Sequence, residues 1–115
     1  MTWSVIFYET ARGEKPVEEF IQSLDVKAKD KVARTLDHLE EFGTHLGPPH
    51  MKKLSGTSLW ELRILGSDSI RIFYVTFTQK TFLLLHGFKK KKQKTPRKEI
   101  KIAENRLTET SARAK

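Results

Sequence analysis

The sequence predicts a single α+β domain in which one antiparallel sheet is covered on one face by two N-terminal helices, with elements in the order β-α-α-β-β-β-α. Two segments in the first half repeat apolar residues at helical spacing. Three segments in the second half are rich in β-branched and aromatic residues and have short links, which is typical of an antiparallel meander. A chain of 115 residues is one domain by size. We place this domain at residues 1–108, with a disordered tail at residues 109–115.

The first half of the chain accounts for one strand and the two helices. Residues 2–8 are apolar or aromatic at both parities, as expected of a strand that is buried on both faces. A short amphipathic helix begins near Pro16, because proline favours the first helical position. A longer amphipathic helix follows Asp25 and ends at Gly43, because glycine readily adopts the left-handed conformation that terminates helices.

An extended surface connection is expected next, over residues 43–56, because a Gly-Pro-Pro run within it excludes helix and strand. Residues 60–64 then alternate apolar side chains with Glu61 and Arg63. This alternation predicts a strand with one buried and one polar face. Residues 66–69, Gly-Ser-Asp-Ser, are expected to form a turn.

Two strands and a helix complete the predicted domain. Residues 70–77 and 81–88 are nearly continuous apolar runs separated by a short turn, which predicts neighbouring antiparallel strands. A Thr-Pro pair then favours a helix from Pro96 to about Leu107. With the two early helices on one face of the sheet, the other face is expected to be partly open.

Positive charge is concentrated in one stretch of the chain. Residues 89–106 contain nine Lys or Arg against Glu99 and Glu104, and therefore carry +7 of the formal net charge of +8. A local cluster of one sign attracts polyanions and releases counterions when phosphates are neutralised, which indicates a nucleic-acid partner. The alternative is a solvated, frayed segment. We favour a functional role because the buried strand at residues 82–88 anchors the cluster to the domain.

Composition excludes several other classes of protein. No apolar run approaches the roughly 20 residues that a membrane span needs, and the N-terminal residues lack the basic region of a signal peptide. The absence of cysteine excludes thiolate chemistry and is consistent with the reducing cytoplasm, where we place the protein. The four histidines have no metal-ligand spacing, so neither a metal nor another cofactor is expected.

Several segments resemble the RelE/ParE toxin superfamily: KLSG at residues 53–56, WELRI, IRIFY, and HGFKKKKQKTPRKEI with the helix after it. The last of these resembles the phage-derived, HigB-like branch. The resemblance covers nearly the whole chain and implies a RelE-like fold, similar to that of microbial ribonucleases. It also implies the toxin of a type II toxin–antitoxin module that cuts mRNA in the ribosomal A site without a metal and so inhibits translation. The implied partners are the ribosome, mRNA and a cognate antitoxin, HigA-like and with a helix-turn-helix domain.

The resemblance also implies roles for particular residues. Arg63 falls where RelE-type toxins place a basic strand residue at the scissile phosphate, and Arg71, in an R-x-x-Y pattern with Tyr74, matches the arginine that stabilises the phosphorane. Two features depart from RelE, because Glu61 stands in place of a lysine and the last helix has no tyrosine or histidine. The remaining catalytic candidates lie just after the last strand: Lys89, Lys90 and Lys91. The candidate RNA-binding residues are Lys52, Lys53, Lys92, Lys94, Arg97 and Lys98.

The chemistry of RNA cleavage requires a deprotonated ribose 2′-oxygen and stabilisation of the charge on the pentavalent phosphate. Arginines and lysines can supply the second requirement without a metal. The candidate general bases are Glu61 and His86, with His50 or a lysine of residues 89–94 as further alternatives, and spacing does not select among them.

Each candidate also has a structural interpretation. Arg63 and Arg71 could pair with Glu61 and Asp68, as strand arginines commonly do. His86 lies in an apolar strand, where a hydrogen-bonded structural imidazole is expected. Four large aromatic side chains within apolar strands are expected in the core rather than as platforms for RNA bases: Trp3, Trp60, Phe73 and Phe77.

Two other functions are consistent with the same fold. The first is a ParE-like inhibitor of DNA gyrase without nuclease activity, and the second is a non-enzymatic RNA-binding regulatory module. Arg71 and the basic cluster favour the nuclease, because inhibition of gyrase needs no phosphate-directed charge. The missing aromatic residue on the last helix favours the regulatory module.

Overall fold

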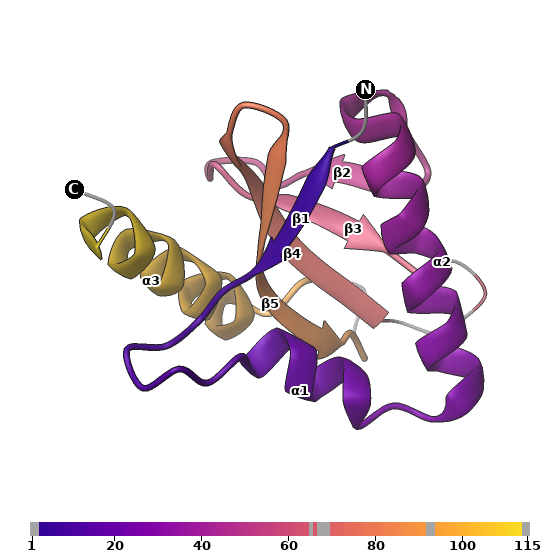
Figure 1. The fold of residues 1–115 in the computed structure, drawn as a ribbon, viewed down its shortest axis with the longest axis horizontal. Coiled ribbons are helices and arrows are strands. Elements are labelled where there is room, and N and C mark those ends of the chain that lie inside the picture. The colour runs from indigo at the N-terminus through magenta and orange to yellow at the C-terminus, as the bar shows by residue number, and fades with distance from the viewer. Residues whose placement is uncertain (1–2, 65, 67–69, 92–93, 114–115) are drawn as a thin grey trace.

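The computed structural model describes residues 3–64, 66, 70–91 and 94–113, which form a five-stranded sheet between helices (Figure 1). The strand order is β1-β5-β4-β3-β2. The strands are β1 (Ser4–Phe7), β2 (Met51–Lys53), β3 (Trp60–Arg63), β4 (Ile70–Thr78) and β5 (Thr81–Lys89). The helices are α1 (Pro16–Gln22), α2 (Val26–Phe42), the short 3-10 helix η1 (Gly43–His45) and α3 (Arg97–Arg113).

The antiparallel meander β3-β4-β5 that the sequence predicts is confirmed, but the prediction of a wholly antiparallel sheet is wrong. Strand β1 pairs with β5 in parallel, with Ser4 opposite Thr81 and Phe7 opposite Leu84. The chain reaches β5 from β1 through two α-helices, the short helix η1 and three strands, and such a crossover permits parallel pairing. Strand β1 is also an edge strand whose Ile6 is 41% exposed, so the prediction of burial on both faces is wrong.

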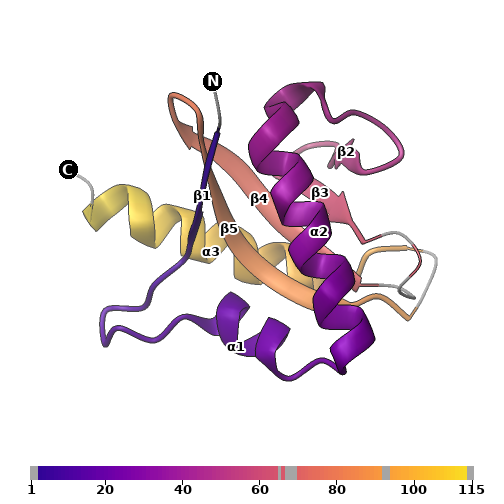
Figure 2. The same cartoon turned by 45° about the vertical axis from the view of Figure 1, so that its right-hand side comes forward.

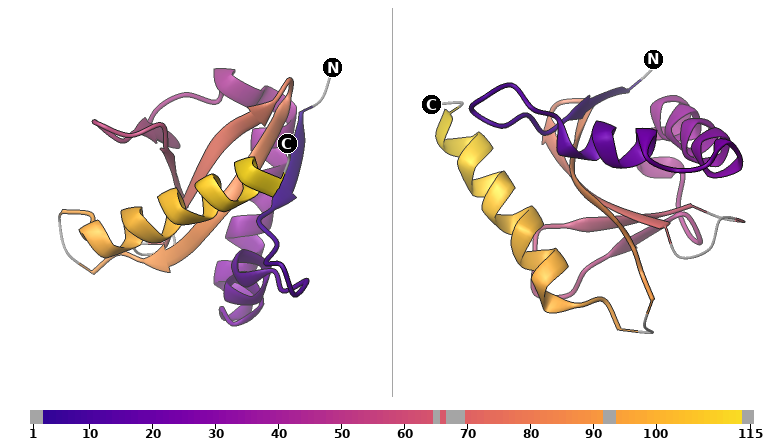
Figure 3. Two further views of the ribbon diagram at one scale, coloured as in Figure 1. Left: turned by 90° about the vertical axis from the view of Figure 1, so that its left-hand side faces the viewer. Right: turned by 90° about the horizontal axis from the view of Figure 1, so that it is seen from below.

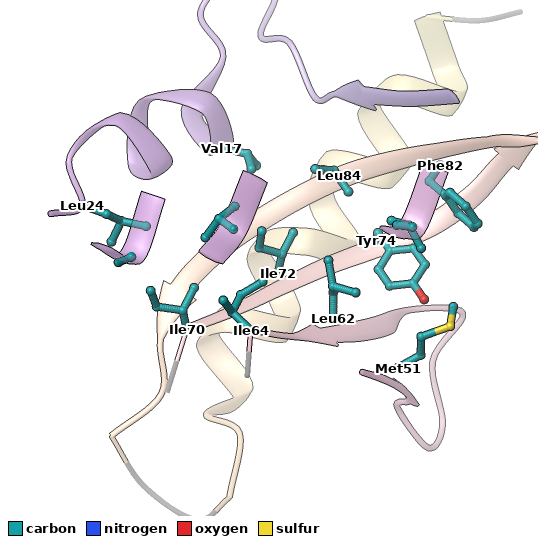
Figure 4. Close-up of a cluster of buried hydrophobic side chains, with 13 residues drawn as sticks. Val17, Leu24, Met51, Leu62, Ile64, Ile70, Ile72, Tyr74, Phe82 and Leu84 are labelled. Atoms are coloured by element: carbon teal, nitrogen blue, oxygen red, sulfur yellow. The ribbon is translucent and has the colours of Figure 1, made fainter. Parts of the chain in front are cut away.

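Helices α1 and α2 cover one face of the sheet, as predicted (Figure 2). Asp25 begins α2 by accepting a hydrogen bond from the amide of Ala28 at 2.8 Å. Gly43 ends it with φ 56°, and a Cβ there would lie 2.0 Å from Nε1 of Trp3. The core beneath these helices joins Val17 of α1 and residues of α2 to side chains of β2–β5, including Leu62, Ile72, Tyr74 and Leu84 (Figure 4).

Helix α3 packs on β4 and β5 of the opposite face (Figure 3), whereas Lys52 of β2 and Arg63 of β3 stay at least partly exposed there, so this face is partly open, as expected. Buried Ala103 lies between Ile100 and Leu107 in a stripe that packs on a second core. The helix continues to Arg113, so the prediction of a disordered end from residue 109 is wrong for residues 109–113. The last turns are held down because the hydroxyl of Tyr8 donates to Oε2 of Glu109 at 2.9 Å.

The connection predicted over residues 43–56 contains η1 and the strand β2. Met51 of β2 lies opposite Leu62 of β3, and three residues are too few to show a strand period in the sequence. Of the predicted turn at 66–69, only Gly66 belongs to the described residues, with φ 77°. The core interpretation of the aromatic residues is confirmed: Phe73 is fully buried, and three more are partly buried against the two cores, namely Trp3, Trp60 and Phe77.

Candidate nucleic-acid interface

The pairing of strands brings charged residues together on the α3 side of the sheet. Arg63 lies opposite Arg71, and Glu61 lies opposite Phe73, which in turn lies opposite His86. Residues directly opposite each other in a sheet share a face, so these side chains form two adjacent rows. Both rows lie at the end of the sheet where β3 and β5 finish and β4 begins. Arg63, Arg71 and Lys89, the first residue of the basic run, therefore lie near one end of the sheet.

Glu61 is the centre of a cluster that also contains Arg63, Arg71 and Thr95, and we call it the paired-arginine cluster. Its side chain is only 1% exposed, and Oε1 lies 3.3 Å from Nε of Arg63 and 3.5 Å from Nε of Arg71. Its other oxygen, Oε2, accepts a hydrogen bond from the hydroxyl of Thr95 at 3.2 Å. Two arginines directly opposite each other repel, and a carboxylate between them offsets that repulsion. The ion pairing that the structural interpretation predicts with Glu61 is thus present, whereas Asp68 lies outside the described residues.

The two arginines keep donors free for another anion. Arg71 donates from Nη1 to the carbonyl of Ile70 at 3.0 Å, and its side chain is 19% exposed. Arg63 is 32% exposed, and none of the described residues hydrogen-bonds to its Nη1 or Nη2. Nε of Arg63 therefore donates a hydrogen bond to Glu61, whereas Nε of Arg71 is close enough to Glu61 for an ion pair but is buried without a hydrogen bond to any described residue. A planar guanidinium held in this way is suited to bidentate binding of a phosphate.

Lysines and an arginine extend the positive charge around this end of the sheet. Lys89 ends β5 opposite Ile70, the residue before Arg71, and is exposed. Lys52 of β2 lies opposite Glu61. Of the other predicted residues, Lys90 is partly buried, whereas Lys53, Lys91, Lys94, Arg97 and Lys98 are exposed, and Lys92 lies outside the described residues. Lys52 thus lies in the row of Glu61, Lys89 lies at the same end of the sheet, and Lys94, Arg97 and Lys98 are within three residues of Thr95. Lys53 lies opposite Trp60, on the other face of the sheet.

His86 has the contacts of a structural imidazole. Its Nε2 is 2.7 Å from Oε1 of Glu99, and its Nδ1 is 3.4 Å from Nη1 of Arg106. Arg106 also donates to the carbonyl of Leu85 at 2.9 Å, so the three side chains fasten α3 to β5. Burial lowers the pKa of His86, although the hydrogen bond to Glu99 and the negative charge of that carboxylate oppose this shift. Both ring nitrogens are engaged, which makes His86 a poor general base.

His50 extends the row of arginines toward β2. The amide of Arg63 donates to the carbonyl of His50 at 2.8 Å, which continues the β2–β3 pairing by two residues beyond Lys52. Strand alternation places His50 on the same face as Lys52, beside Arg63. Its Nδ1 is buried and has no hydrogen-bond partner among the described residues. The sequence suggested His50 only as an alternative base, because its proximity to Arg63 depends on pairing that involves the unpredicted strand β2.

Tyr74 does not join the site, although the R-x-x-Y pattern places it near Arg71 in sequence. It is 1% exposed and belongs to the core under α1 and α2, on the opposite face from Arg71 (Figure 4). Sequence reasoning also missed Thr95 as a site residue, because the Thr-Pro pair indicated only a helix start. Among the described residues, no three His, Asp or Glu side chains are grouped closely enough to hold a metal ion.

Fold and charge together define a class of protein: a small α+β protein with one sheet and a paired-arginine cluster at its basic end. Residues 19–108 match the family model described as phage derived protein Gp49-like (DUF891), and the chain belongs to this family. The family comprises type II toxins related to the RelE-like toxins, which implies an antitoxin as partner. No curated protein matches the chain. No helix among the described residues is long and apolar enough to cross a membrane.

Proposed function

We propose that this protein is a HigB-like toxin that acts in the cytoplasm as a ribosome-dependent mRNA endonuclease and thereby inhibits translation. The observation that carries the proposal is the pair of arginines held by buried Glu61 at the basic end of the sheet. Membership in a family related to the RelE-like toxins supports it. The cognate antitoxin, HigA-like with a helix-turn-helix domain, would neutralise the toxin by covering this end of the sheet.

In this mechanism, the 2′-oxygen of the RNA gives its proton to a general base and bonds to the adjacent phosphorus, while the bond from phosphorus to the 5′-oxygen breaks and that oxygen takes a proton from water. The products are a 2′,3′-cyclic phosphate and a 5′-hydroxyl, and no metal takes part. Arg71 and Arg63 donate to the non-bridging oxygens as negative charge develops in the transition state. Glu61 and Thr95 are positioning residues, because they fix the guanidiniums before RNA binds. Lys89, Lys90 and Lys91 hold the flanking phosphates.

We assign proton transfer from the 2′-hydroxyl to His50 rather than to Glu61 or His86. The carboxylate of Glu61 already contacts both arginines and Thr95, and the ring of His86 contacts Glu99 and Arg106. The ring of His50, in the row of Arg63, makes no hydrogen bond to a described residue, and because its Nδ1 is buried, the proton would pass to Nε2. The ribosome would hold the message in the extended path that brings the 2′-hydroxyl within reach, an orientation effect worth about 7–11 kcal/mol in well-oriented systems.

Expression of the protein in growing cells tests this function. RNA 5′ ends, protein synthesis and DNA supercoiling are followed after induction, with Arg71→Ala as the matched variant. The proposal predicts new 5′ ends within translated regions of messages and an early stop in protein synthesis, both absent with Arg71→Ala. A change in supercoiling without new 5′ ends would instead indicate a ParE-like gyrase inhibitor. Inhibition of translation without cleavage would indicate the RNA-binding regulatory module.

A further inference from the structure

A polar groove of about 610 Å³ lies between α3 and the turn that joins β2 to β3. One wall is the turn at residues 55–57, and the other is the side of α3 that carries Arg97, Lys98 and Lys101, with Glu104 and Asn105 at the far end. This volume is within the range of about 300–1,000 Å³ that is usual for small-ligand sites. The groove follows α3 from Arg97 to Asn105. At a rise of 1.5 Å per residue this length is about 12 Å, which is enough for one or two nucleotides.

The turn that forms one wall is fixed by its own hydrogen bonds. The hydroxyl of Thr57 donates to the carbonyl of Leu54 at 2.9 Å and accepts from the amide of Leu59 at 3.0 Å. Gly56 has φ 76°, and a Cβ there would meet no atom within 4 Å. The backbone of the turn therefore borders open space, and the groove is preformed rather than dependent on a ligand.

Charge in the groove favours an anionic ligand. Arg97, Lys98 and Lys101 are exposed, and none of them forms an ion pair with another described residue. Glu104 is the acid on the α3 wall, two turns along the helix from Arg97. Three cations on one wall attract the phosphates of a polyanion, whereas the carboxylate and the amide of Asn105 can hydrogen-bond to base edges.

The groove is continuous with the paired-arginine cluster on both walls. Thr95, whose hydroxyl contacts Glu61 at 3.2 Å, precedes Arg97 on the α3 side by two residues. On the other side, Lys52 lies opposite Glu61 and precedes the 55–57 turn in the same hairpin. Both walls of the groove therefore begin within a few residues of the side chains that contact or face Glu61.

We propose that this groove binds the single-stranded RNA next to the scissile phosphate and sets the base preference of cleavage. Arg97, Lys98 and Lys101 hold phosphates, whereas Glu104 and Asn105 contact the base at the far end. The inference rests on the proposed endonuclease function, because it assumes that RNA lies across Arg63 and Arg71.

The binding claim is tested without cleavage, with a short single-stranded RNA that is methylated on its 2′-oxygens. Fluorescence anisotropy over a range of salt compares the wild type with Arg97→Gln/Lys98→Gln/Lys101→Gln. The matched control, Arg12→Gln/Lys27→Gln/Arg34→Gln, removes the same charge from exposed positions outside the groove. The groove variant should bind about tenfold more weakly and lower the log–log salt slope by roughly 2, at about 0.7 per lost contact. Equal loss in the two variants would overturn the proposal, because it would show a response to net charge alone.

The base-reading claim is tested by the positions of cleavage. Asn105→Ala and Glu104→Gln are compared with the wild type by mapping RNA 5′ ends from programmed ribosomes. The proposal expects a changed base frequency next to the cut in at least one variant. An unchanged base frequency in both variants would overturn it. If the wild type does not cleave, the proposed function fails, and the anisotropy measurement still decides whether the groove binds RNA.

Discussion

Replacing Glu61 by Gln removes the negative charge that lies between Arg63 and Arg71 while retaining the shape of the side chain. In the native structure the two guanidiniums are 3.3 and 3.5 Å from one buried oxygen. The neutral amide leaves two positive charges directly opposite each other on adjacent strands. We therefore expect Glu61→Gln to lower the free energy of unfolding and to create a stronger site for anions.

The magnitude follows from the burial of the three side chains. Removing one partner of a fully buried ion pair costs about 3–5 kcal/mol. Because Arg63 and Arg71 are 32% and 19% exposed, water screens part of the repulsion, and we expect a loss of about 1–3 kcal/mol. For a domain of this size, that loss lowers the melting temperature by roughly 5–15 °C.

Thermal unfolding at low ionic strength, with and without sulfate, measures both effects. Sulfate should raise the melting temperature of Glu61→Gln more than that of the wild type, because an anion that binds the native state stabilises it. Glu41→Gln, which removes an exposed carboxylate outside the groove and the arginine cluster, serves as the matched control and should change neither quantity. An unchanged melting temperature for Glu61→Gln, or an equal response of both proteins to sulfate, would show that Glu61 does not hold the arginines.

Three further predictions concern the stability of the fold. Tyr74→Phe removes a buried hydroxyl that has no partner among the described residues, so it should raise the free energy of unfolding by about 1 kcal/mol in urea titrations without reducing toxicity. Burial holds the pKa of His86 below its ordinary value of 6.5, so the unfolded chain binds the proton first as pH falls. The free energy of unfolding should therefore decline as the pH falls below about 6.5. Urea titrations of His86→Gln at a series of pH values should show a smaller decline over the same range. Gly87→Ala places a Cβ 2.6 Å from Cδ2 of Phe20, so urea titrations should show a loss of about 1–3 kcal/mol as α1 is displaced.

The parts of the fold that could be predicted from sequence are those with a local signal. Helix α2 has an apolar stripe, the capping Asp25 and the terminating Gly43, and each of these acts within a few residues. The parallel pairing of β1 with β5 has no such signal, because it joins segments that are more than seventy residues apart. The packing of α3 on the sheet depends on a short apolar stripe around Ala103. The many basic residues of the same helix make this stripe hard to recognise in the sequence.

The candidate site was predictable in its charge but not in its geometry. Alternation along β3 correctly placed Glu61 and Arg63 on one face, but it could not show that Glu61 is buried and is contacted by Thr95 from a distant segment. His50 acquires its position from pairing with Arg63, in a stretch where proline obscured the strand. Tyr74 is close to Arg71 in sequence but lies in the core under α1 and α2, so closeness in sequence was misleading for this residue.

The measurement that tests the central claim most directly is cleavage in a purified system. One mRNA is incubated with the protein either naked or bound in programmed ribosomes, and its 5′ ends are mapped over time. We predict that the wild type cuts only the ribosome-bound message and that Arg71→Ala cuts it about 10²–10³-fold more slowly, as expected when one donor to a developing charge is lost. Comparable cleavage of the naked mRNA, full activity of folded Arg71→Ala, or no cleavage of either RNA by the wild type would contradict the account.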